Sequence, residues 1–147
     1  MIAPGKEISC FCLGGISFST FICYDLRFPE IFRISARKSH VIIVPANWPK
    51  SRREQWITLL KARAIENQVY VIGVNCVGKI GSAIYSGDSC LIRPDGQVVI
   101  SAVETEEVLT FHLMDDITMV RKNFPIWEDS KPVFYANLYA EAAVEDE

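Results

Sequence analysis

The chain has 147 residues, a length that suits one domain with a substantial core. Half of its residues are hydrophobic and its formal net charge is −3, a balance that argues against a basic nucleic-acid-binding surface. No apolar run is long enough to cross a membrane, and the N-terminus lacks the pattern of a signal peptide. Five cysteines, an odd number, indicate reduced thiols rather than a disulfide framework. We therefore expect a soluble cytoplasmic protein.

Two short strands are predicted at the beginning of the chain. The first covers residues 8–13 and ends at Gly14-Gly15, and the second covers residues 16–23. Cys10 and Cys12 stand two residues apart, but the other Cys and His residues are too scattered to complete a metal site. We therefore interpret these two cysteines as alternating positions of a strand and expect no metal.

The stretch from Phe21 to Glu30 combines the features of a nucleophile site. A strand ends at Cys23, a polar turn follows, and Pro29 stands where a helix can begin. This order places a thiol at the carboxyl end of a strand, beside backbone N–H groups that are free to bind an anion. Acyl transfer by a cysteine needs both groups. A buried structural cysteine at the end of a strand has the same local pattern, so both interpretations stay open at this point.

The middle of the chain alternates strands and helices. Strands are predicted over residues 40–44 and 69–75, and the clearest helix covers residues 51–67. This order predicts an α/β fold with right-handed crossovers. His40 opens its strand at the end away from Cys23, which argues against a catalytic base. Arg63, Glu66 and Asn67 border the apolar stripe of the helix, where an internal ion pair or an active-site wall would each explain them.

The last third of the chain has a different pattern. Strands at residues 89–92 and 98–102 flank a turn that contains Pro94-Asp95-Gly96, which predicts a hairpin. Residues 108–113 alternate between apolar and polar side chains and predict another strand, and residues 115–122 predict a helical turn. We expect one domain over residues 1–139 and a disordered acidic tail over residues 140–147.

Several motifs together resemble one family, the nitrilase-type carbon–nitrogen hydrolases, from about Pro4 to Asp129. The motifs are Ile-Cys-Tyr-Asp-Leu-Arg-Phe-Pro-Glu at residues 22–30, Pro-Ala-Asn-Trp-Pro at 45–49, Ala-Arg-Ala-Ile-Glu-Asn-Gln at 62–68, Tyr-Ser-Gly-Asp-Ser at 85–89 with Pro-Asp-Gly at 94–96, and the segment 121–129. Two of them, the Ala-Asn-Trp-Pro loop and the Ala-Ile-Glu-Asn-Gln-Val-Tyr helix end, most resemble the ω-amidase branch. Enzymes of that branch hydrolyse the terminal amide of acids similar to 2-oxoglutaramate.

The resemblance implies a fold and a mechanism. The family fold is an αββα sandwich, of which this chain matches the carboxyl-terminal part, and subunits usually pair into a four-layer stack. Cys23 would attack the carbon of a small amide or ω-amide acid, and the backbone N–H of Tyr24 would bind the oxyanion. Family enzymes use no metal or organic cofactor.

Four further residues are candidates for the substrate pocket. Loops beyond the ends of parallel strands bind ligands in α/β sheets, and four side chains lie on such loops: Arg27, Phe28, Asn47 and Trp48. A structural ion pair with Asp25 or Glu30 is an equal alternative for Arg27.

The sequence departs from the family pattern in three respects. The family has a glutamate base, a supporting glutamate and a lysine before the cysteine, whereas only Lys6 and Glu7 are charged here before Cys23, and they match no motif. Gln55 stands where the family often has His, and Cys76 stands where the ω-amidase branch tends to have Arg. We therefore expect little turnover by this chain alone. It would pair with itself or be completed by an amino-terminal half. The alternative function is a non-catalytic half-domain, an interaction subunit that needs a separate amino-terminal chain.

Overall fold

The computed structural model describes residues 5–114 and 116–144, and the chain divides into two compact units, residues 1–117 and 118–147. The elements of the first unit follow in chain order: β1 (Cys10–Leu13), β2 (Ile16–Thr20), the short 3-10 helix η1 (Cys23–Arg27), α1 (Pro29–Ser35), β3 (Val41–Ala46), the 3-10 turn η2 (Lys50–Arg52), α2 (Arg53–Asn67), β4 (Tyr70–Asn75), β5 (Val77–Ile80), β6 (Ala83–Ile92) and β7 (Val98–Val103). The helix α3 (Ile117–Asn123) begins at the boundary of the two units.

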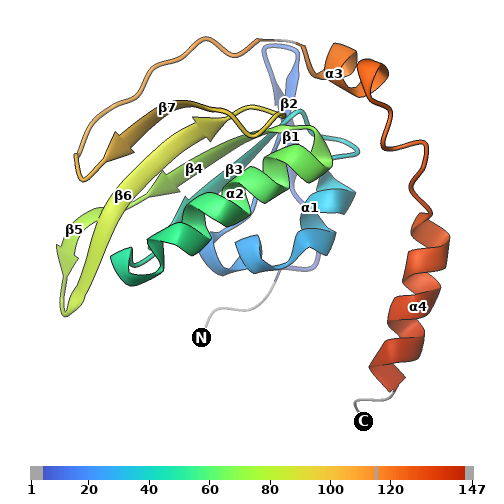
Figure 1. Cartoon of the computed structure of the whole chain (residues 1–147), viewed down its shortest axis with the longest axis horizontal. Coiled ribbons are helices and arrows are strands. Elements are labelled where there is room, and N and C mark those ends of the chain that lie inside the picture. Colours follow the sequence, from blue (N-terminus) through green and yellow to red (C-terminus); the bar gives the residue numbers. More distant parts are fainter. Residues whose placement is uncertain (1–4, 115, 145–147) are drawn as a thin grey trace. The chain divides into compact units, whose positions relative to one another are not determined.

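One sheet organises the first unit (Figure 1). Strands β2, β3 and β4 are parallel neighbours, and β1 pairs with β2 in the antiparallel sense. The long strand β6 runs antiparallel to β4 and β7, and its first residues pair with β5. The turn between β6 and β7 is the predicted hairpin, in which Gly96 adopts a φ of +85° that favours glycine. The three parallel strands end at the same edge of the sheet, and this edge positions the candidate site.

Both α1 and α2 cover the same face of this sheet (Figure 1). Trp56 and Leu60 of α2 are buried against β4, where an added Cβ on Gly73 would lie 2.6 Å from a Leu60 methyl group. The predicted helix over residues 51–67 is confirmed, except that its first residues form the 3-10 turn. The predicted α/β class is confirmed as well, and this chain supplies one sheet with helices on one face.

The opposite face of the sheet is less completely covered. Val41, Tyr70 and Leu91 form a buried cluster there, and Phe111 and Leu113 pack against it. The prediction of a strand over residues 108–113 is wrong, because this segment forms no ladder with a neighbouring strand. Its alternation of apolar and polar side chains reflects an extended segment that covers the sheet with every second side chain.

The second unit contains the end of α3 and the helix α4 (Pro132–Val144). Residues 132–143 of α4 are all exposed. The acidic tail predicted from residue 140 begins inside α4, which extends to Val144, and residues 145–147 lie outside the described residues. Alanines at 140, 142 and 143 favour the helix because they lose no side-chain entropy in it. In the described part of the chain, no helix is both long enough and apolar enough to cross a bilayer.

Candidate functional site

The candidate site lies where the three parallel strands end. Beyond β2 the chain turns into η1 at Cys23, beyond β3 it forms the loop that contains Asn47, and beyond β4 it reaches Cys76. Backbone hydrogen bonds hold these strand ends together, since the N–H of Phe21 donates to Ile43 and the N–H of Cys76 donates to Ala46. The fold therefore brings together residues that are up to about fifty positions apart in the sequence.

Cys23 occupies a strained position at the start of η1. Its φ is +45°, in the left-handed region that residues other than glycine rarely adopt. The turn is closed on both sides, because the Asp25 N–H donates to the Ile22 carbonyl and the Ile22 N–H donates to the Asp25 carboxylate at 2.8 Å. The sharp turn leaves the thiol half-buried at the end of β2.

The N–H of Tyr24 is the donor next to this thiol. It donates to no group in the described parts of the chain, whereas the N–H of Asp25 is already bound. A free N–H in the first turn of a helix is available to an anionic ligand. The ring of Tyr24 points into an exposed edge-to-face contact with Phe28, with 5.4 Å between the ring centroids.

Arg63 of α2 binds the backbone of η1. Its side chain is 5% exposed, and its guanidinium donates to the carbonyl of Leu26 at 2.7 Å and to the Glu66 carboxylate at 2.9 Å. The guanidinium also lies over the Phe32 ring, 5.3 Å from its centroid. Of the two explanations that the sequence left open for Arg63 and Glu66, the internal ion pair is confirmed. Arg63 ties the best-formed helix to the loop that carries Cys23.

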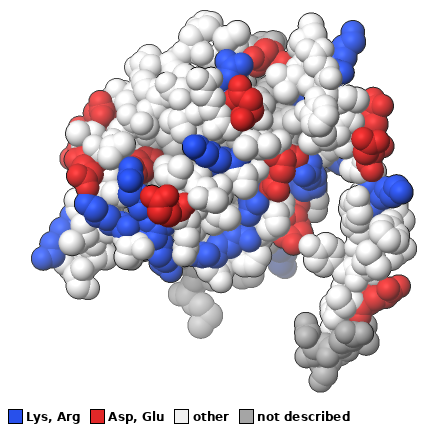
Figure 2. Space-filling model, viewed as in Figure 1, with Lys and Arg blue, Asp and Glu red and all other residues white. Residues whose placement is uncertain are grey.

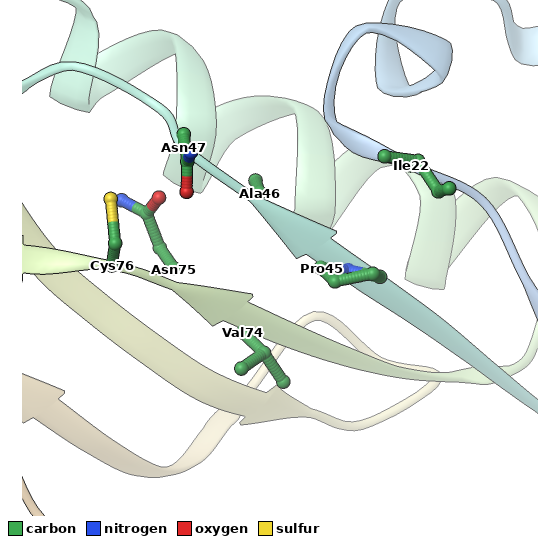
Figure 3. A pocket seen from close by; sticks show the side chains of 7 residues that line it. All are labelled: Ile22, Pro45, Ala46, Asn47, Val74, Asn75 and Cys76. Atoms are coloured by element: carbon green, nitrogen blue, oxygen red, sulfur yellow. The ribbon is translucent and has the colours of Figure 1, made fainter. Parts of the chain in front are cut away.

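A pocket of about 430 Å³ opens beside this loop (Figure 3). Its lining comes from three strand ends: Ile22, Pro45, Ala46, Asn47, Val74, Asn75 and Cys76. Ile22 lies across the pocket from Asn75 and Cys76 (Figure 3). Every lining side chain is apolar or neutral, so in the described structure the pocket wall contributes no acid, base or cation.

Cys76 forms part of the far wall of this pocket. Burial raises the pKa of its thiol, and the negative charge of an ionised Cys23 raises it further, which places the two thiols within electrostatic reach. The raised pKa keeps Cys76 in its neutral, weakly nucleophilic form. Cys23, at the strained turn, is therefore the better candidate for the nucleophile.

Asn75 fixes the loop between β3 and η2. Its side-chain oxygen accepts from the Trp48 N–H at 2.7 Å, and its amide nitrogen donates to the carbonyls of Trp48 and Gly87 at 3.0 and 2.8 Å. An amide is suited to this position because it offers an acceptor and two donors together. The sequence analysis did not select Asn75. A polar residue that ends an apolar run, here 69–74, could have indicated that its side chain binds a neighbouring loop.

Only one of the four residues predicted from the sequence to form the substrate pocket lines it. Asn47 lines the pocket, whereas Trp48 is 3% exposed and packs against Trp56, with 5.7 Å between ring centroids. Arg27 lies with its guanidinium 5.0 Å from the centroid of the Trp48 ring. Phe28 is exposed at the start of α1 and is not part of the pocket wall.

The alternative ion pair of Arg27 with Asp25 or Glu30 is not formed. Arg27 instead donates to the side-chain oxygen of Gln55 at 2.9 Å. Gln55, which departs from the family pattern, therefore anchors the end of η1. In residues 5–114 and 116–144, no group of three or more Cys, His, Asp or Glu residues is placed to hold a metal ion.

A second polar cluster joins the first residue of α2 to β6. Arg53 donates to both carboxylate oxygens of Asp88 at 2.8 Å, and Ser86 donates to the same carboxylate. Burial alone raises the pKa of Asp88, but the bonds from Arg53 and Ser86 outweigh it, so the pKa lies below its ordinary value. This cluster is ionised and fully paired, which suits a structural role.

Comparison with known proteins identifies the family of this α/β chain. The family model described as carbon-nitrogen hydrolase matches residues 2–122, and the chain belongs to that family. It is 41% identical over 123 residues to a protein of Staphylococcus aureus named hydrolase in agr operon, and this match covers 82% of this chain and 47% of that protein. It is 35% identical over 136 residues to the 2-oxoglutaramate amidase of Bacillus subtilis, and this match covers 91% of this chain and 52% of that enzyme.

Solved structures place the fold in the nitrilase superfamily. A CN-hydrolase superfamily protein from Xanthomonas campestris superposes with a TM-score of 0.82 at 36% identity, over 88% of this chain and 52% of that chain. Nit3 of Saccharomyces cerevisiae, a member of branch 10 of the nitrilase superfamily, superposes with a TM-score of 0.78 at 31% identity, over 84% of this chain and 47% of that chain. The predicted nitrilase-type fold is confirmed, and the chain spans about half the length of the relatives it matches.

Proposed function

We propose that this chain supplies the nucleophile of an amidase, with Cys23 as the attacking thiol and the N–H of Tyr24 as an oxyanion donor. The observation that carries the proposal is the strained turn at Cys23, with a φ of +45°, at a strand end that borders a pocket. Such strain persists where the surrounding structure enforces it, and it often serves to present a reactive group.

The proposed reaction has two steps. The Cys23 thiol gives up its proton and attacks the carbonyl carbon of a small amide. The C–N bond then breaks, and the nitrogen takes up that proton and leaves as ammonia. Water then attacks the resulting thioester and the C–S bond breaks: the hydroxyl of the water completes the carboxylic acid, and its other proton restores the Cys23 thiol. The N–H of Tyr24 stabilises the oxyanion in both steps because its direction is fixed before the charge develops.

We infer from its relatives that the substrate is an ω-amide of a short acid. Several similar proteins carry the names 2-oxoglutaramate amidase or omega-amidase, including relatives from Bacillus subtilis and Escherichia coli. The five cysteines of this chain are free thiols in the structure, which supports a reducing compartment such as the cytoplasm.

Catalysis also needs a base and a second oxyanion donor, which the described pocket wall does not provide. An unassisted thiol is only slightly ionised at neutral pH. We propose that an amino-terminal half-domain brings these groups, either from another chain or from a segment joined to this one. The relatives are about twice as long as the matched region, which supports this proposal.

The second candidate function is a non-catalytic interaction subunit. It is favoured by the sheet face opposite the helices, where apolar side chains such as Val74 remain 48% exposed. Exposed apolar surface and open strand edges favour association. Both functions predict binding to an amino-terminal half, but only the first predicts turnover.

Ammonia release tests the proposed function. This chain would be combined with the amino-terminal half of the Bacillus subtilis relative, mixed or fused, and assayed on glutaramate. We expect ammonia release that is lost in Cys23→Ala and kept in the matched variant Cys12→Ala, whose exposed thiol does not line the pocket. Stable assembly without turnover, or equal turnover by the Cys23→Ala assembly, would contradict a nucleophilic role for Cys23.

A further inference from the structure

An extended segment, residues 105–114, crosses the sheet face opposite the helices, the open face, without pairing with a neighbouring strand (Figure 1). In the part of the chain that the structure describes, none of its backbone N–H or C=O groups forms a backbone hydrogen bond. Such groups along an extended chain are what an edge strand offers to the next strand of a sheet. The segment therefore presents an unused set of backbone donors and acceptors.

The side chains of this segment already alternate as in a strand that lies on a sheet. Leu109, Phe111 and Leu113 are half-buried, and the last two pack against the buried cluster on the open face. The side chains between them are exposed, and Val108 is 93% exposed. In a strand with this alternation the N–H and C=O groups point sideways, parallel to the surface on which the strand lies. A strand paired with the segment would therefore extend a second layer over the open face.

Both ends of the segment are held in place by the first unit. Before it, the N–H of Glu104 donates to the carbonyl of Ser86 in β6 at 2.8 Å. After it, the carboxylate of Asp116 accepts from the Tyr70 hydroxyl at 2.9 Å, and its other oxygen lies 3.5 Å from a guanidinium nitrogen of Arg93. An extended segment that is fixed at both ends loses less conformational entropy on pairing than a free one, so it is prepared to receive a strand.

The lengths of the relatives indicate what can supply that strand. The matches to the Staphylococcus aureus and Bacillus subtilis proteins cover 47% and 52% of those proteins, so about as much chain again lies outside the matched region in each. The helix-covered face of this chain carries many charged side chains, as Figure 2 shows, which suits contact with water. The open face has the unused backbone, and Val74 of this face also lines the pocket. A second layer on the open face would thus reach the pocket whose described wall contributes no base.

We propose that residues 105–114 form the docking strand for the amino-terminal half-domain. A strand of that half-domain pairs with one edge of the segment through backbone hydrogen bonds, and its sheet covers the open face. This inference rests on the proposed function and names the surface on which this chain receives its second half. Because main-chain groups supply the bonds, affinity depends on the extended backbone, and register depends on the alternating apolar side chains. In the assembled enzyme the segment 108–113 is then a strand, as its alternation indicates, although it forms none in this chain.

Residue-resolved amide hydrogen exchange tests this proposal. The isolated chain would be compared with a fusion in which the amino-terminal half of the Bacillus subtilis relative precedes it. In a strand paired on one edge, every second N–H is bonded to the neighbour. We expect exchange in the fusion to slow by about 100-fold at every second amide of residues 105–114, and by much less at the amides between them. Unchanged exchange over this segment, or protection that arises instead on the outer edge of β1 or β7, would overturn the proposal.

Two proline variants provide a matched pair. Thr110→Pro and Glu107→Pro each remove an N–H that forms no backbone hydrogen bond in the described chain, and these two N–H groups point to opposite edges of the segment. Both variants of the isolated chain should therefore keep its melting temperature. In the fusion, the variant that removes an N–H on the protected edge should lose the protection, and the other should keep it. Equal behaviour of the two variants would contradict strand pairing. Because exchange needs no turnover, it is measured equally well on the Cys23→Ala fusion, and its result is independent of the ammonia assay that tests the proposed function.

Discussion

At the scale of single residues, the site depends on a few polar side chains that have fixed tasks in the fold. Asn75 binds three backbone groups at once, Arg63 holds the carbonyl of Leu26, and Asp25 closes the turn at Cys23. None of them is proposed to touch the reacting atoms. They hold the backbone in the conformation that presents Cys23 and shapes the pocket. Asn75 and Arg63 do so by binding buried main-chain groups that would otherwise be unpaired, and Asp25 does so by binding the exposed N–H of Ile22.

Replacing Asn75 by Asp should destabilise the protein. A carboxylate cannot donate, so it would face the carbonyls of Trp48 and Gly87 and leave both without a partner. We expect the free energy of unfolding to fall by about 1–3 kcal/mol per unsatisfied group. Denaturant unfolding measures this change. The matched control, Asn47→Asp, makes the same substitution on the exposed neighbouring loop, and an equal loss in both variants would show that Asn75 does not hold the loop.

Asp88 should make stability depend on pH in the acidic range. Its pKa is lower in the folded protein than the ordinary value of 3.8, so its stabilising contribution is present above that pH. The contribution is lost as the pH falls through the folded pKa. We expect Asp88→Asn and Arg53→Gln each to lower the free energy of unfolding at pH 6, with a smaller difference from the wild type below pH 3.8. Unfolding curves at both pH values test this, and a constant difference would contradict it.

At the scale of elements, close packing of α2 on β4 fixes the distance between helix layer and sheet. Gly73 makes this approach possible, since an added Cβ would lie 2.6 Å from Leu60 and 2.8 Å from Trp56. The glycine is required for space rather than for backbone freedom, because its φ is not positive.

Gly73→Ala should therefore lower stability. The new methyl group would push against the Trp56 ring, which cannot move aside easily, and overpacking of this kind costs about 1–3 kcal/mol. Thermal unfolding measures the effect. Gly5→Ala is the matched control, because the nearest atom to its added Cβ is 3.9 Å away, and it should leave the melting temperature unchanged. A melting temperature of Gly73→Ala equal to that of the wild type would show that α2 can shift.

The elements with strong local signals were predictable from the sequence. The apolar runs of β3 and β4, the stripe of α2 and the glycine turn of the hairpin were found because periodicity and turn chemistry act over a few residues. The segment 108–113 was assigned wrongly because alternation reports which side chains are buried. It does not report whether a neighbouring strand is present to pair with the backbone.

The site was predictable only in part for the same reason. Cys23 and the loop with Asn47 were found because they follow recognisable strands. The hydrogen bonds of Asn75, the contact of Arg27 with Gln55 and the packing of Trp48 under the loop join residues from different elements. Such contacts follow from the way the strands and helices are assembled, which no local pattern encodes.

At the scale of the whole molecule, the two faces of the sheet differ in cover. The face under α1 and α2 is buried, as Ile42, Val44 and Val71 show, whereas the opposite face is covered only in part, by the segment that contains Phe111 and Leu113. The chain spans about half the length of its relatives. The uncovered face, together with a pocket wall that contributes no base, is the physical reason for proposing that a second half-domain completes the enzyme.

Mapping the covalent intermediate tests the nucleophilic role of Cys23 most directly. The assembly with the amino-terminal half would be mixed with glutaramate and quenched in acid within a turnover, and its peptides analysed by mass spectrometry. We predict a thioester-linked acyl group on the peptide that contains Cys23, sensitive to hydroxylamine and absent from Cys23→Ala. Turnover with the acyl group on another residue, or with an identical adduct in Cys23→Ala, would contradict the assignment.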